Sequence, residues 1–422
     1  MFALVDCNNF YASCERVFQP QFNNKPVAIL SNNDGCVISR SDEAKALGLP
    51  MGAPAFKYEG FFKAHNIRVF SSNYPLYGDM SNRVMSILEQ FTPGVEVYSI
   101  DEAFLQFKGF EDYDFNAYGL QIRQRVLKWT GVPTCVGIAP TKALSKVANK
   151  IARKYPKQTN GVYVIDSEDK RVKALKWTKI ESVWGIGRGL QKRLKSRHCI
   201  NAYDFTQLSD EWIRTNMAVV GLRLKKELLG ISTLALEEPI LQKKAIATTP
   251  SFEYTYTDLD NLKERISTFA TSCSEKLRKQ HSCCNMIYVF IKNNKHNRTG
   301  ERYQSMSTIV NLPYATDSSL IISKYATEAL KDIFKKGLHY KKAGVILMGL
   351  VPKNERQLNL FTIENPKHKP LMKTIDRINK KYESHKIKLG NQDLKRTWKM
   401  RQERFSSKYT TNINEILTVK CH

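Results

Sequence analysis

The chain has 422 residues and a formal net charge of +26, from 66 lysines and arginines against 40 aspartates and glutamates. This length exceeds a typical single domain and is sufficient for three or four small ones. No apolar run approaches the roughly 20 residues of a membrane span, so the sequence excludes a transmembrane protein. The positive excess predicts a polyanionic partner.

The charge is unevenly distributed along the chain. Residues 1–105 hold eight lysines and arginines against eleven acidic residues, a net charge of −3, and the remainder carries about +29. An acidic N-terminal part and a basic body are typical of a metal-dependent enzyme that acts on nucleic acid. The alternative interpretation is a solvated basic surface that keeps the chain soluble.

The cysteines predict a reduced, cytoplasmic protein. There are nine of them, without a Cys-x-x-Cys pair, and only Cys283 and Cys284 are neighbours. His281 beside these two lacks the second ligand pair of a zinc site. The N-terminal segment MFALVDCNNF has no basic leader, so we expect no signal peptide.

The elements predicted along the first 165 residues alternate between strands and helices. Short strands are expected at FALV, PVAIL, IRVF, VEVYSI, TCVGI and VYVI. The segment TKALSKVANKIARK, from Thr141, places Leu144, Val147, Ala148 and Ile151 on one helical stripe and basic residues on the other face. This mixture predicts an α+β domain.

The rest of the chain divides into three further parts. Residues 166–235 are predicted to be mostly helical. Residues 245–350 contain two amphipathic helices, one from Leu259 to Lys279, among about four strands, which predicts a small sheet with helices on one face. Residues 352–422 carry a net charge of +10 and predict a tail or an accessory module.

Three acidic residues are candidates for a metal site. Asp6 ends the first predicted strand, and Asp101 and Glu102 lie in the segment VYSIDEAF (97–104). If the two strands are neighbours, three carboxylates meet at one edge and repel each other unless cations lie among them. Hard oxygen ligands suit Mg²⁺, and two such ions can catalyse phosphoryl transfer. Adjacent strand residues face opposite sides, however, so the strand must end or bend between Asp101 and Glu102.

Six ordered segments carry a resemblance to a known family. They are DCNNFYASCE (6–15), SNNDGCVISRSDEAKALG (31–48), SSNYPLYGDMSNRVMSILE (71–89), VYSIDEAF (97–104), VGIAPTKALSKVANKIARK (136–154) and VWGIGRGLQKRL (183–194). Together they resemble the Y-family translesion DNA polymerases, most closely those of UmuC type. The resemblance covers essentially the whole chain.

The resemblance implies an α+β multidomain fold in the form of a right hand. A ferredoxin-like palm would comprise residues 1–11 and 75–165, and small fingers residues 12–74. A helical thumb with a helix-hairpin-helix would span residues 166–238, and an α/β little finger residues 242–351. Residues 352–422 would hold a clamp-binding segment and a C-terminal accessory region.

The resemblance also assigns the catalytic residues. Asp6, Asp101 and Glu102 match the family's catalytic carboxylates and, with the main-chain carbonyl of Cys7, would hold two Mg²⁺ ions. A primer 3′-hydroxyl would attack the α-phosphate of a dNTP, with catalysis by positioning and charge neutralisation. Tyr11 matches the sugar gate that excludes a ribose 2′-hydroxyl, whereas Phe10 is expected to pack inward.

The resemblance gives four candidate residues for contact with the triphosphate of the incoming nucleotide. Ser39 and Lys45 match such residues, although Lys45 is often arginine in relatives. The position of Asp42 is often tyrosine, which leaves that phosphate contact open. Either Arg153 or Lys154 would reach the β- and γ-phosphates, and the sequence does not decide between them.

Two further segments would bind macromolecules. Gly185 and Gly187 permit a tight hairpin whose following helix amides would meet a DNA phosphate. The segment QLNLF, with Gln357, Leu358, Leu360 and Phe361, matches the pentapeptide that binds the sliding β clamp. The resemblance further implies primer-template DNA, a processed UmuD-type dimer and RecA as partners.

These expectations together predict an error-prone, template-directed DNA polymerase for translesion synthesis and SOS mutagenesis. One rival is a non-catalytic scaffold in DNA repair that binds DNA and the clamp, which the intact acidic residues argue against. A second rival is another two-metal enzyme, such as a nucleotidyl cyclase, which the helix-hairpin-helix turn and the basic little finger disfavour.

Overall fold

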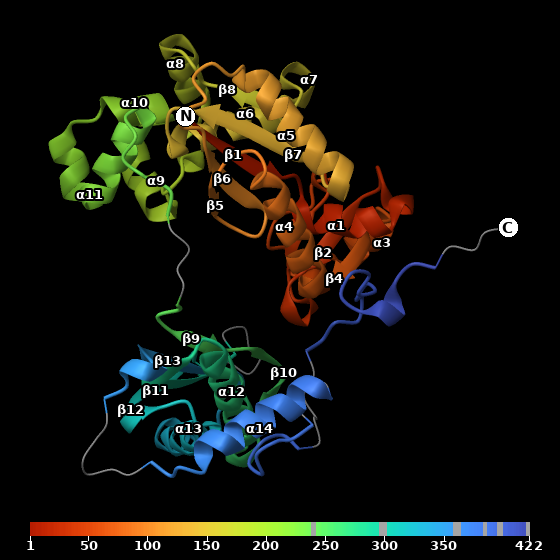
Figure 1. Cartoon of the computed structure of the whole chain (residues 1–422), viewed down its shortest axis with the longest axis vertical. Helices are drawn as coiled ribbons and strands as arrows, with labels where there is room; N and C mark the ends of the chain where they lie inside the picture. Colours follow the sequence, from red (N-terminus) through yellow and green to blue (C-terminus); the bar gives the residue numbers. More distant parts are fainter. Residues whose placement is uncertain (238–241, 295–301, 358–363, 383–385, 395–399, 419–422) are drawn as a thin grey trace. The chain divides into compact units, whose positions relative to one another are not determined.

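The structure is a computed structural model of the whole chain, in which two compact units are distinguished (Figure 1). It describes residues 1–237, 242–294, 302–357, 364–382, 386–394 and 400–418. The first unit comprises residues 1–239 and 402–422, and the second comprises residues 240–401. Strands and helices occur in both units, so the predicted α+β multidomain architecture is confirmed.

The main sheet of the first unit has five strands in the order β5-β6-β1-β7-β8. Strand β1 is antiparallel to both β6 and β7, and β7 is parallel to β8. The strands are β1 (Phe2–Cys7), β5 (Gly94–Val97), β6 (Glu102–Gln106), β7 (Thr134–Ala139) and β8 (Val162–Val164). The central strand β1 is therefore hydrogen-bonded on both sides, which fixes the register of Asp6.

Helices cover both faces of this sheet. Alternate residues of its buried strands point to opposite faces, so apolar side chains on each face need a covering layer. Ala3 and Val5 of β1 belong to a core with α1 (Phe10–Phe18), α4 (Tyr74–Leu88) and α5 (Phe115–Thr130). Helix α6 (Lys142–Lys154) packs on β1 and β7 at the other face. Its predicted apolar stripe, Leu144, Val147, Ala148 and Ile151, is confirmed as buried.

The contact between α6 and β7 is unusually close, because residue 137 is glycine. A Cβ atom at Gly137 would lie 2.0 Å from the backbone N of Asn149 and 2.4 Å from the carbonyl O of Ser145. The Asn149 side chain uses this proximity to donate from Nδ2 to the carbonyl oxygens of Leu4 (3.1 Å) and Cys135 (2.8 Å). The helix is thereby fixed across the two central strands.

Three strands between residues 27 and 71 form a smaller sheet of order β3-β2-β4. Strand β2 pairs antiparallel with β3 and parallel with β4, and the helices around them share a separate core. The elements are η1 (Pro20–Phe22), β2 (Val27–Leu30), η2 (Asn32–Asp34), β3 (Val37–Arg40), α2 (Asp42–Ala46), α3 (Ala55–Ala64) and β4 (Arg68–Ser71).

The segment from 156 to 228 is helical apart from β8, as predicted for its larger part. Its elements are α7 (Pro156–Thr159), α8 (Glu168–Trp177), η3 (Ile180–Ser182), α9 (Arg188–Lys195), α10 (Ala202–Gln207) and α11 (Asp210–Leu228). Its attachment to the sheet depends on Glu227, which is fully buried. The Glu227 carboxylate accepts hydrogen bonds from the backbone N–H groups of Ala143 (3.2 Å) and Thr233 (2.6 Å), so it lies at the N-terminus of α6.

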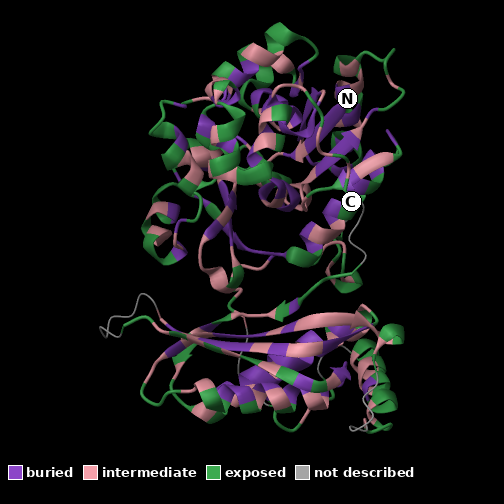
Figure 2. Cartoon of the chain, turned by 90° about the vertical axis from the view of Figure 1, so that its left-hand side faces the viewer, coloured by how far each residue is buried: buried purple, intermediate pink, exposed green. Residues whose placement is uncertain are grey.

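The second unit has a sheet of order β10-β13-β11-β12, with β9 paired to β13. Helices α12 and α13 share its hydrophobic core, and the buried residues lie between helices and sheet (Figure 2). The elements are β9 (Ile246–Thr248), β10 (Ser251–Tyr256), α12 (Leu259–Lys279), β11 (Ser282–Asn293), β12 (Ser305–Thr316), α13 (Ser319–Ile333), β13 (Tyr340–Pro352), η4 (Lys353–Glu355) and α14 (His368–Lys381). The expected helix from Leu259 to Lys279 is confirmed.

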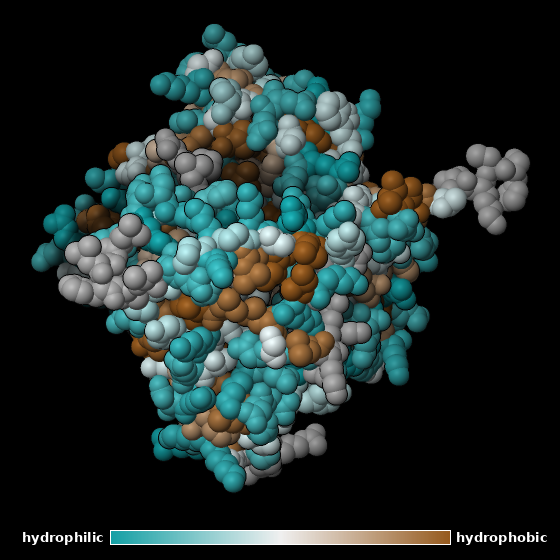
Figure 3. Space-filling model, turned by 60° about the horizontal axis from the view of Figure 1, so that its bottom comes forward, coloured by the Kyte–Doolittle hydropathy of each residue, from teal (hydrophilic) through white to brown (hydrophobic). Residues whose placement is uncertain are grey.

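Hydrophilic side chains cover most of the face drawn in Figure 3, and hydrophobic groups form smaller patches among them. Of the helices in the described part of the chain, none combines the length and hydropathy that crossing a membrane requires.

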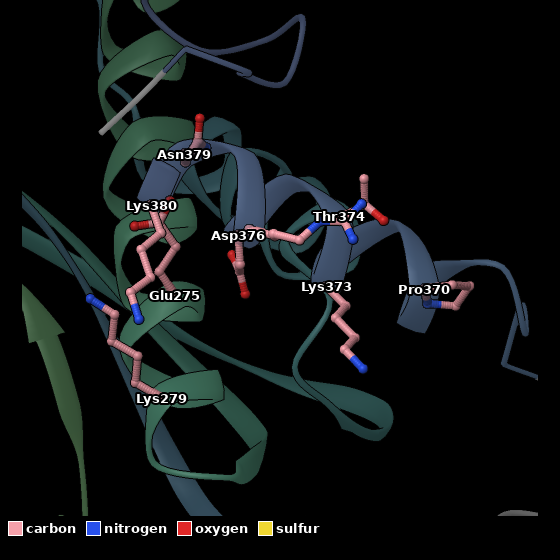
Figure 4. A pocket seen from close by; sticks show the side chains of 9 residues that line it. Glu275, Lys279, Pro370, Lys373, Thr374, Asp376, Asn379 and Lys380 are labelled. Carbon is pink, nitrogen blue, oxygen red and sulfur yellow. The ribbon is translucent and has the colours of Figure 1, made fainter. Parts of the chain in front are cut away.

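A cavity of about 1090 Å³ lies between α12 and α14 in the second unit. Figure 4 shows Glu275 and Lys279 of α12 opposite side chains of α14, among them Lys373 and Lys380. The two helices are joined by Arg278, which pairs with Asp376 through Nε (2.6 Å) and Nη2 (2.7 Å).

The C-terminal region, expected as one accessory part after residue 352, is divided between the two units. Helix α14 belongs to the second unit, whereas residues 402–418 pack on the first, where the short turn η5 (Ile413–Glu415) occurs. Sequence reasoning did not anticipate this return, because it depends on contacts more than 300 residues apart.

We expect Gly137→Ala to destabilise the first unit by about 3 kcal/mol or more, at the upper end of overpacking costs, because backbone atoms of α6 cannot yield to a methyl group. Thermal unfolding measures the loss. The matched control is Gly60→Ala in the exposed middle of α3, where nothing lies within 4 Å of an added Cβ. This control should gain up to about 1 kcal/mol from helix propensity. Equal melting temperatures for the two variants would contradict the close packing.

Candidate active site

The structure brings the predicted acidic residues together at one end of the main sheet. Asp6 of β1 and Glu102 of β6 are directly opposed in the antiparallel register. Opposed residues project from the same face with Cβ atoms about 5 Å apart. Asp101 precedes the first residue of β6, so the alternation of strand side chains does not apply to it. Its carbonyl O accepts a 2.9 Å hydrogen bond from the backbone N of Cys7, which ties the turn to β1.

Each of the three carboxylates has its own polar partner. Asp6 pairs with Arg153 at 3.0 Å, and Glu102 pairs with Lys146 at 3.1 Å. Both cations come from one side of α6, since seven residues are close to two helical turns. Asp101 accepts a 2.6 Å hydrogen bond from the Ser99 hydroxyl.

Burial raises the pKa of Asp6 to about 7, well above its ordinary value. The charge of Arg153 opposes this shift, and the negative charges of Glu102 and Asp101 add to it. The ionised form of Asp6 is therefore favoured only by nearby positive charge. This end of the sheet is a place where an added cation would be stabilised.

The donor chemistry of this cluster fits a hard divalent ion. Asp6, Asp101 and Glu102 offer carboxylate oxygens and Cys7 a carbonyl oxygen, which are the ligands that Mg²⁺ prefers. In the described residues, no group of three or more His, Cys, Asp or Glu side chains is gathered closely enough to hold a metal. Asp6 instead faces Arg153, Glu102 faces Lys146, and Asp101 faces the hydroxyl of Ser99.

A basic cavity of about 870 Å³ is lined in part by Arg153, the cation that pairs with Asp6. Six cationic side chains line it and one carboxylate, Asp42, offsets them. The cations are Lys45, Arg123, Lys150, Arg153, Lys154 and Lys179. Burial lowers the pKa of the Lys150 ammonium, which agrees with crowding of like charge away from water. Such a cavity suits a ligand with several negative charges.

Asn9 connects the cavity to the carboxylates, and sequence reasoning missed it. Its Oδ1 accepts a 2.7 Å hydrogen bond from Nη2 of Arg153 and another from the Lys45 ammonium. Lys45 also donates to Asp42 at 2.9 Å. Asn9 has φ of 50°, a left-handed conformation that asparagine tolerates. An asparagine between a strand and a helix is the only sequence signal for this role.

The two residues left open at the end of α6 take different positions. Arg153 contacts Asp6 and Asn9, whereas Lys154 lines the basic cavity without a described ion pair to the carboxylates. Ser39 is buried on β3 opposite Ile29 and is not among the residues that line the cavity.

Tyr11 lies on α1 within an aromatic cluster. Its ring stacks on Tyr77 with centroids 4.4 Å apart and planes at 15°, and Tyr74 contacts it edge-on at 6.1 Å. Phe10 is buried in the core, as expected. The Tyr77 hydroxyl donates a 2.7 Å hydrogen bond to Oε1 of Glu15, a fully buried carboxylate of α1.

The glycine turn lies where the sequence predicted it. Gly185 has φ of 82°, which requires glycine, and Gly187 is the N-cap of α9. Both glycines are exposed, while Val183 and Ile186 between and beside them are buried in the helical core. The turn is therefore exposed at its two glycines, while its apolar residues hold it in place.

The segment expected to bind the clamp is described only at its first residue. Gln357 is exposed after β13, and Leu358, Leu360 and Phe361 lie outside the described residues.

An aromatic group around Lys146 was also missed at the level of sequence. The ammonium lies 4.3 Å from the ring centroid of Tyr98 and 5.5 Å from those of Phe104 and Trp184. The indole of Trp184 donates to the Tyr98 hydroxyl at 3.0 Å, which joins the glycine turn to the sheet. Such cation–π contacts hold the lysine beside Glu102.

Comparison with known proteins places this arrangement in a defined class. Residues 5–150 match the impB/mucB/samB family and residues 243–360 match its C-terminal domain. Residues 369–419 match a domain of unknown function, DUF4113. The fold is that of the Y-family DNA polymerases: a Y-family DNA polymerase chimera of Dbh and Dpo4 aligns with a TM-score of 0.69 at 22% identity, over 83% of this chain and 99% of that chain.

Curated relatives cover the full length. Protein UmuC of Salmonella typhimurium is 40% identical over 100% of both chains, and Protein MucB of Escherichia coli is 36% identical over 99% of both. DNA polymerase IV of Bacillus velezensis is 26% identical over 92% of this chain and 91% of that protein. The chain belongs to the impB/mucB/samB family.

We expect the stability of the first unit to depend on the ionisation of Glu15. Burial raises the pKa of Glu15 to about 7 from 4.5, although hydrogen bonds from Tyr77 and Ser406 oppose the shift. The folded state therefore binds the proton more tightly than the unfolded chain. Between about pH 4.5 and 7 the stability should fall as pH rises, by about 3 kcal/mol in total.

Glu15→Gln removes this titration, so the melting temperature of the variant relative to the wild type should rise steadily between pH 5 and pH 8. Thermal scans at several pH values measure the difference. Glu89→Gln, at an exposed position after α4, is the matched control. A difference for Glu15→Gln that is constant with pH would show that Glu15 does not titrate in this range.

Proposed function

We infer that the chain is a template-directed DNA polymerase of the Y family, which copies damaged DNA with low fidelity. The observation that carries this inference is the meeting of Asp6 and Glu102 on opposed strands beside a cavity lined by six cations. Nucleotidyl transfer to a primer 3′-hydroxyl requires carboxylates that bind divalent ions and, next to them, cationic side chains that bind a triphosphate.

We propose that Asp6, Asp101, Glu102 and the carbonyl of Cys7 hold two Mg²⁺ ions. When bound, these ions would supply charge neutralisation at the reacting phosphate and activation of the primer hydroxyl. The role of the protein's own residues is then to position the reacting groups. Arg153 and Lys146 keep the acidic residues ordered, and the close packing of α6 fixes both cations relative to the sheet.

We propose that the basic cavity binds the triphosphate of a dNTP. Lys45, Arg153 and Lys154 supply the positive charge, and Asn9 orients two of these three side chains. Of the pair left open by the sequence, Arg153 is the better candidate for contact nearest the reacting phosphate, because it alone touches Asp6. Ser39 belongs to this proposal on resemblance only.

We propose domain roles from the same resemblance. Residues 1–11 and 75–165 act as palm, 12–74 as small fingers, 166–238 as thumb and 242–351 as little finger. The exposed amides at Gly185 and Gly187 would meet a backbone phosphate of the primer-template DNA without reading its bases. Small fingers make few contacts with the nascent pair, which leaves room for lesions and lowers selectivity.

We propose a cytoplasmic enzyme that works at the nucleoid with three protein partners. The segment from Gln357 to Phe361 would bind the sliding β clamp, and a processed UmuD-type dimer and RecA are expected from the relationship to UmuC. These partners rest on resemblance alone. Running-start primer extension past an abasic site, with and without each partner, tests them together with the polymerase activity.

Asp101→Asn should abolish primer extension in Mg²⁺ and dNTPs and leave DNA binding nearly unchanged, because the lost charge belongs to the proposed metal ligands and the Asp101 carboxylate accepts its hydrogen bond from Ser99, outside the glycine turn proposed to meet DNA. Extension assays and fluorescence anisotropy of labelled primer-template measure the two properties. Asp112→Asn, at an exposed position, should retain both. Full extension by Asp101→Asn would refute the catalytic assignment, whereas an inactive wild type that binds DNA would favour the scaffold function.

Tyr11→Ala should admit ribonucleotides, because removal of the ring opens the space that a 2′-hydroxyl needs. Single-nucleotide incorporation with matched dNTP and rNTP gives the ratio of the two efficiencies. Tyr382→Ala, at the exposed end of α14, serves as the control. If Tyr11→Ala and the control discriminate equally, the gate lies elsewhere.

A further inference from the structure

The segment after residue 401 returns to the first unit and packs against it (Figure 1). Arg404 pairs with Ser71 at the end of β4, where its carbonyl O accepts from the Ser71 backbone N at 2.9 Å and its own N donates to Ser71 Oγ at 3.0 Å. Its guanidinium forms two 3.0 Å bonds to Glu59 of α3. The segment therefore lies against the end of β4, an edge strand of the small sheet.

Two residues fix the next part of the segment on α1 and α4. Asn73, the N-cap of α4, is fully buried and donates from Nδ2 to the Ser406 hydroxyl (3.0 Å) and to the carbonyl O of Ser407 (3.2 Å). The Tyr409 ring stacks on Phe18 of α1 with centroids 4.8 Å apart and planes at 5°. These contacts bury polar groups in satisfied pairs, which is typical of a docked segment rather than a free tail.

The segment reaches the nucleotide site through Glu15. The buried Ser406 hydroxyl donates to Oε1 of Glu15 at 2.9 Å, and the Tyr77 hydroxyl donates to the same oxygen at 2.7 Å. The Tyr77 ring in turn stacks on Tyr11 at 4.4 Å. A continuous series of contacts thus joins Ser406, in the C-terminal segment, to Tyr11, nearly 400 residues away in the sequence.

We propose that residues 402–409 are a positioning segment of the nucleotide site, in which Ser406 holds Glu15 and Tyr77 so that the plane of the Tyr11 ring is fixed. The inference rests on the proposed polymerase function and gives part of DUF4113 a role. The Y-family chimera aligns over 99% of its own chain but only 83% of this one, so a sixth of this chain is additional to that fold.

Buried geometry explains why the contact would affect selectivity. Glu15 Oε2 has no hydrogen-bond partner, so Oε1 alone orients the carboxylate. Loss of the Ser406 hydroxyl leaves the Tyr77 hydroxyl as the remaining hydrogen-bond donor that orients the Glu15 carboxylate. If the Tyr77 ring moves, the Tyr11 ring stacked on it takes a wider range of orientations. A sugar gate excludes the 2′-hydroxyl only when its ring is held in place.

Ser406→Ala in the full-length chain tests the proposal under conditions in which the wild type extends a primer. The preference for dNTP over rNTP in single-turnover incorporation should fall by about three- to tenfold, the effect of one hydrogen bond. Thr411→Ala, at an exposed position just after this segment, should keep the wild-type preference. A lower melting temperature for Ser406→Ala with unchanged preference would overturn the proposal, since the segment would then only stabilise the fold.

Tyr77→Phe gives a second reading, because it removes the other donor to Glu15 and keeps the stacked ring. It should lower the preference by a similar factor even if Ser406→Ala fails to fold. The double variant should be no worse than the more affected single variant, because both act through one carboxylate. Multiplicative effects would overturn the pathway through Glu15. A wild type that incorporates no dNTP would overturn the proposed function itself, a different outcome from unchanged preference in an active enzyme.

Discussion

Helix α6 lies against the main sheet at backbone contact distance, and the arrangement of the candidate site depends on this contact. Gly137 permits the approach, and the Asn149 amide then bridges the carbonyl groups of the two central strands. A helix held this closely cannot rotate or slide. Lys146 and Arg153, two turns apart on it, are consequently fixed beside Glu102 and Asp6.

The site gathers like charges and separates them into two groups. Carboxylates lie at the end of β1 and β6, while cations line the adjoining cavity, and Arg153 belongs to both. Burial of Asp6 without a matching cation is unfavourable, as its raised pKa indicates. This separation of charge suits a site that binds a divalent cation and a polyanion. The cation reduces the repulsion among the carboxylates, and the polyanion reduces the repulsion among the cations of the cavity.

The chain passes from the first unit to the second and back again, so residues 240–401 are attached at both of their ends. The hydroxyl of Ser406 in the returning segment donates to the Glu15 carboxylate of α1, and Tyr409 stacks on Phe18 against the core of the first unit. The end of the chain is thus part of the fold that supports the candidate site. Stability of the first unit and order at Tyr11 are consequently linked through the same few buried groups.

Local patterns determined much of this protein. Spacing and residue type predict the apolar stripe of α6, the helix from Leu259 to Lys279 and the three acidic residues. These features depend on residues that are close together in the sequence. Tertiary structure decided which partners these residues meet. The beginning of β6 at Glu102, the shared acceptor on Asn9 and the return of Ser406 to Glu15 depend on segments that are distant in sequence. No local pattern encodes such contacts, since they exist only when the chain has folded.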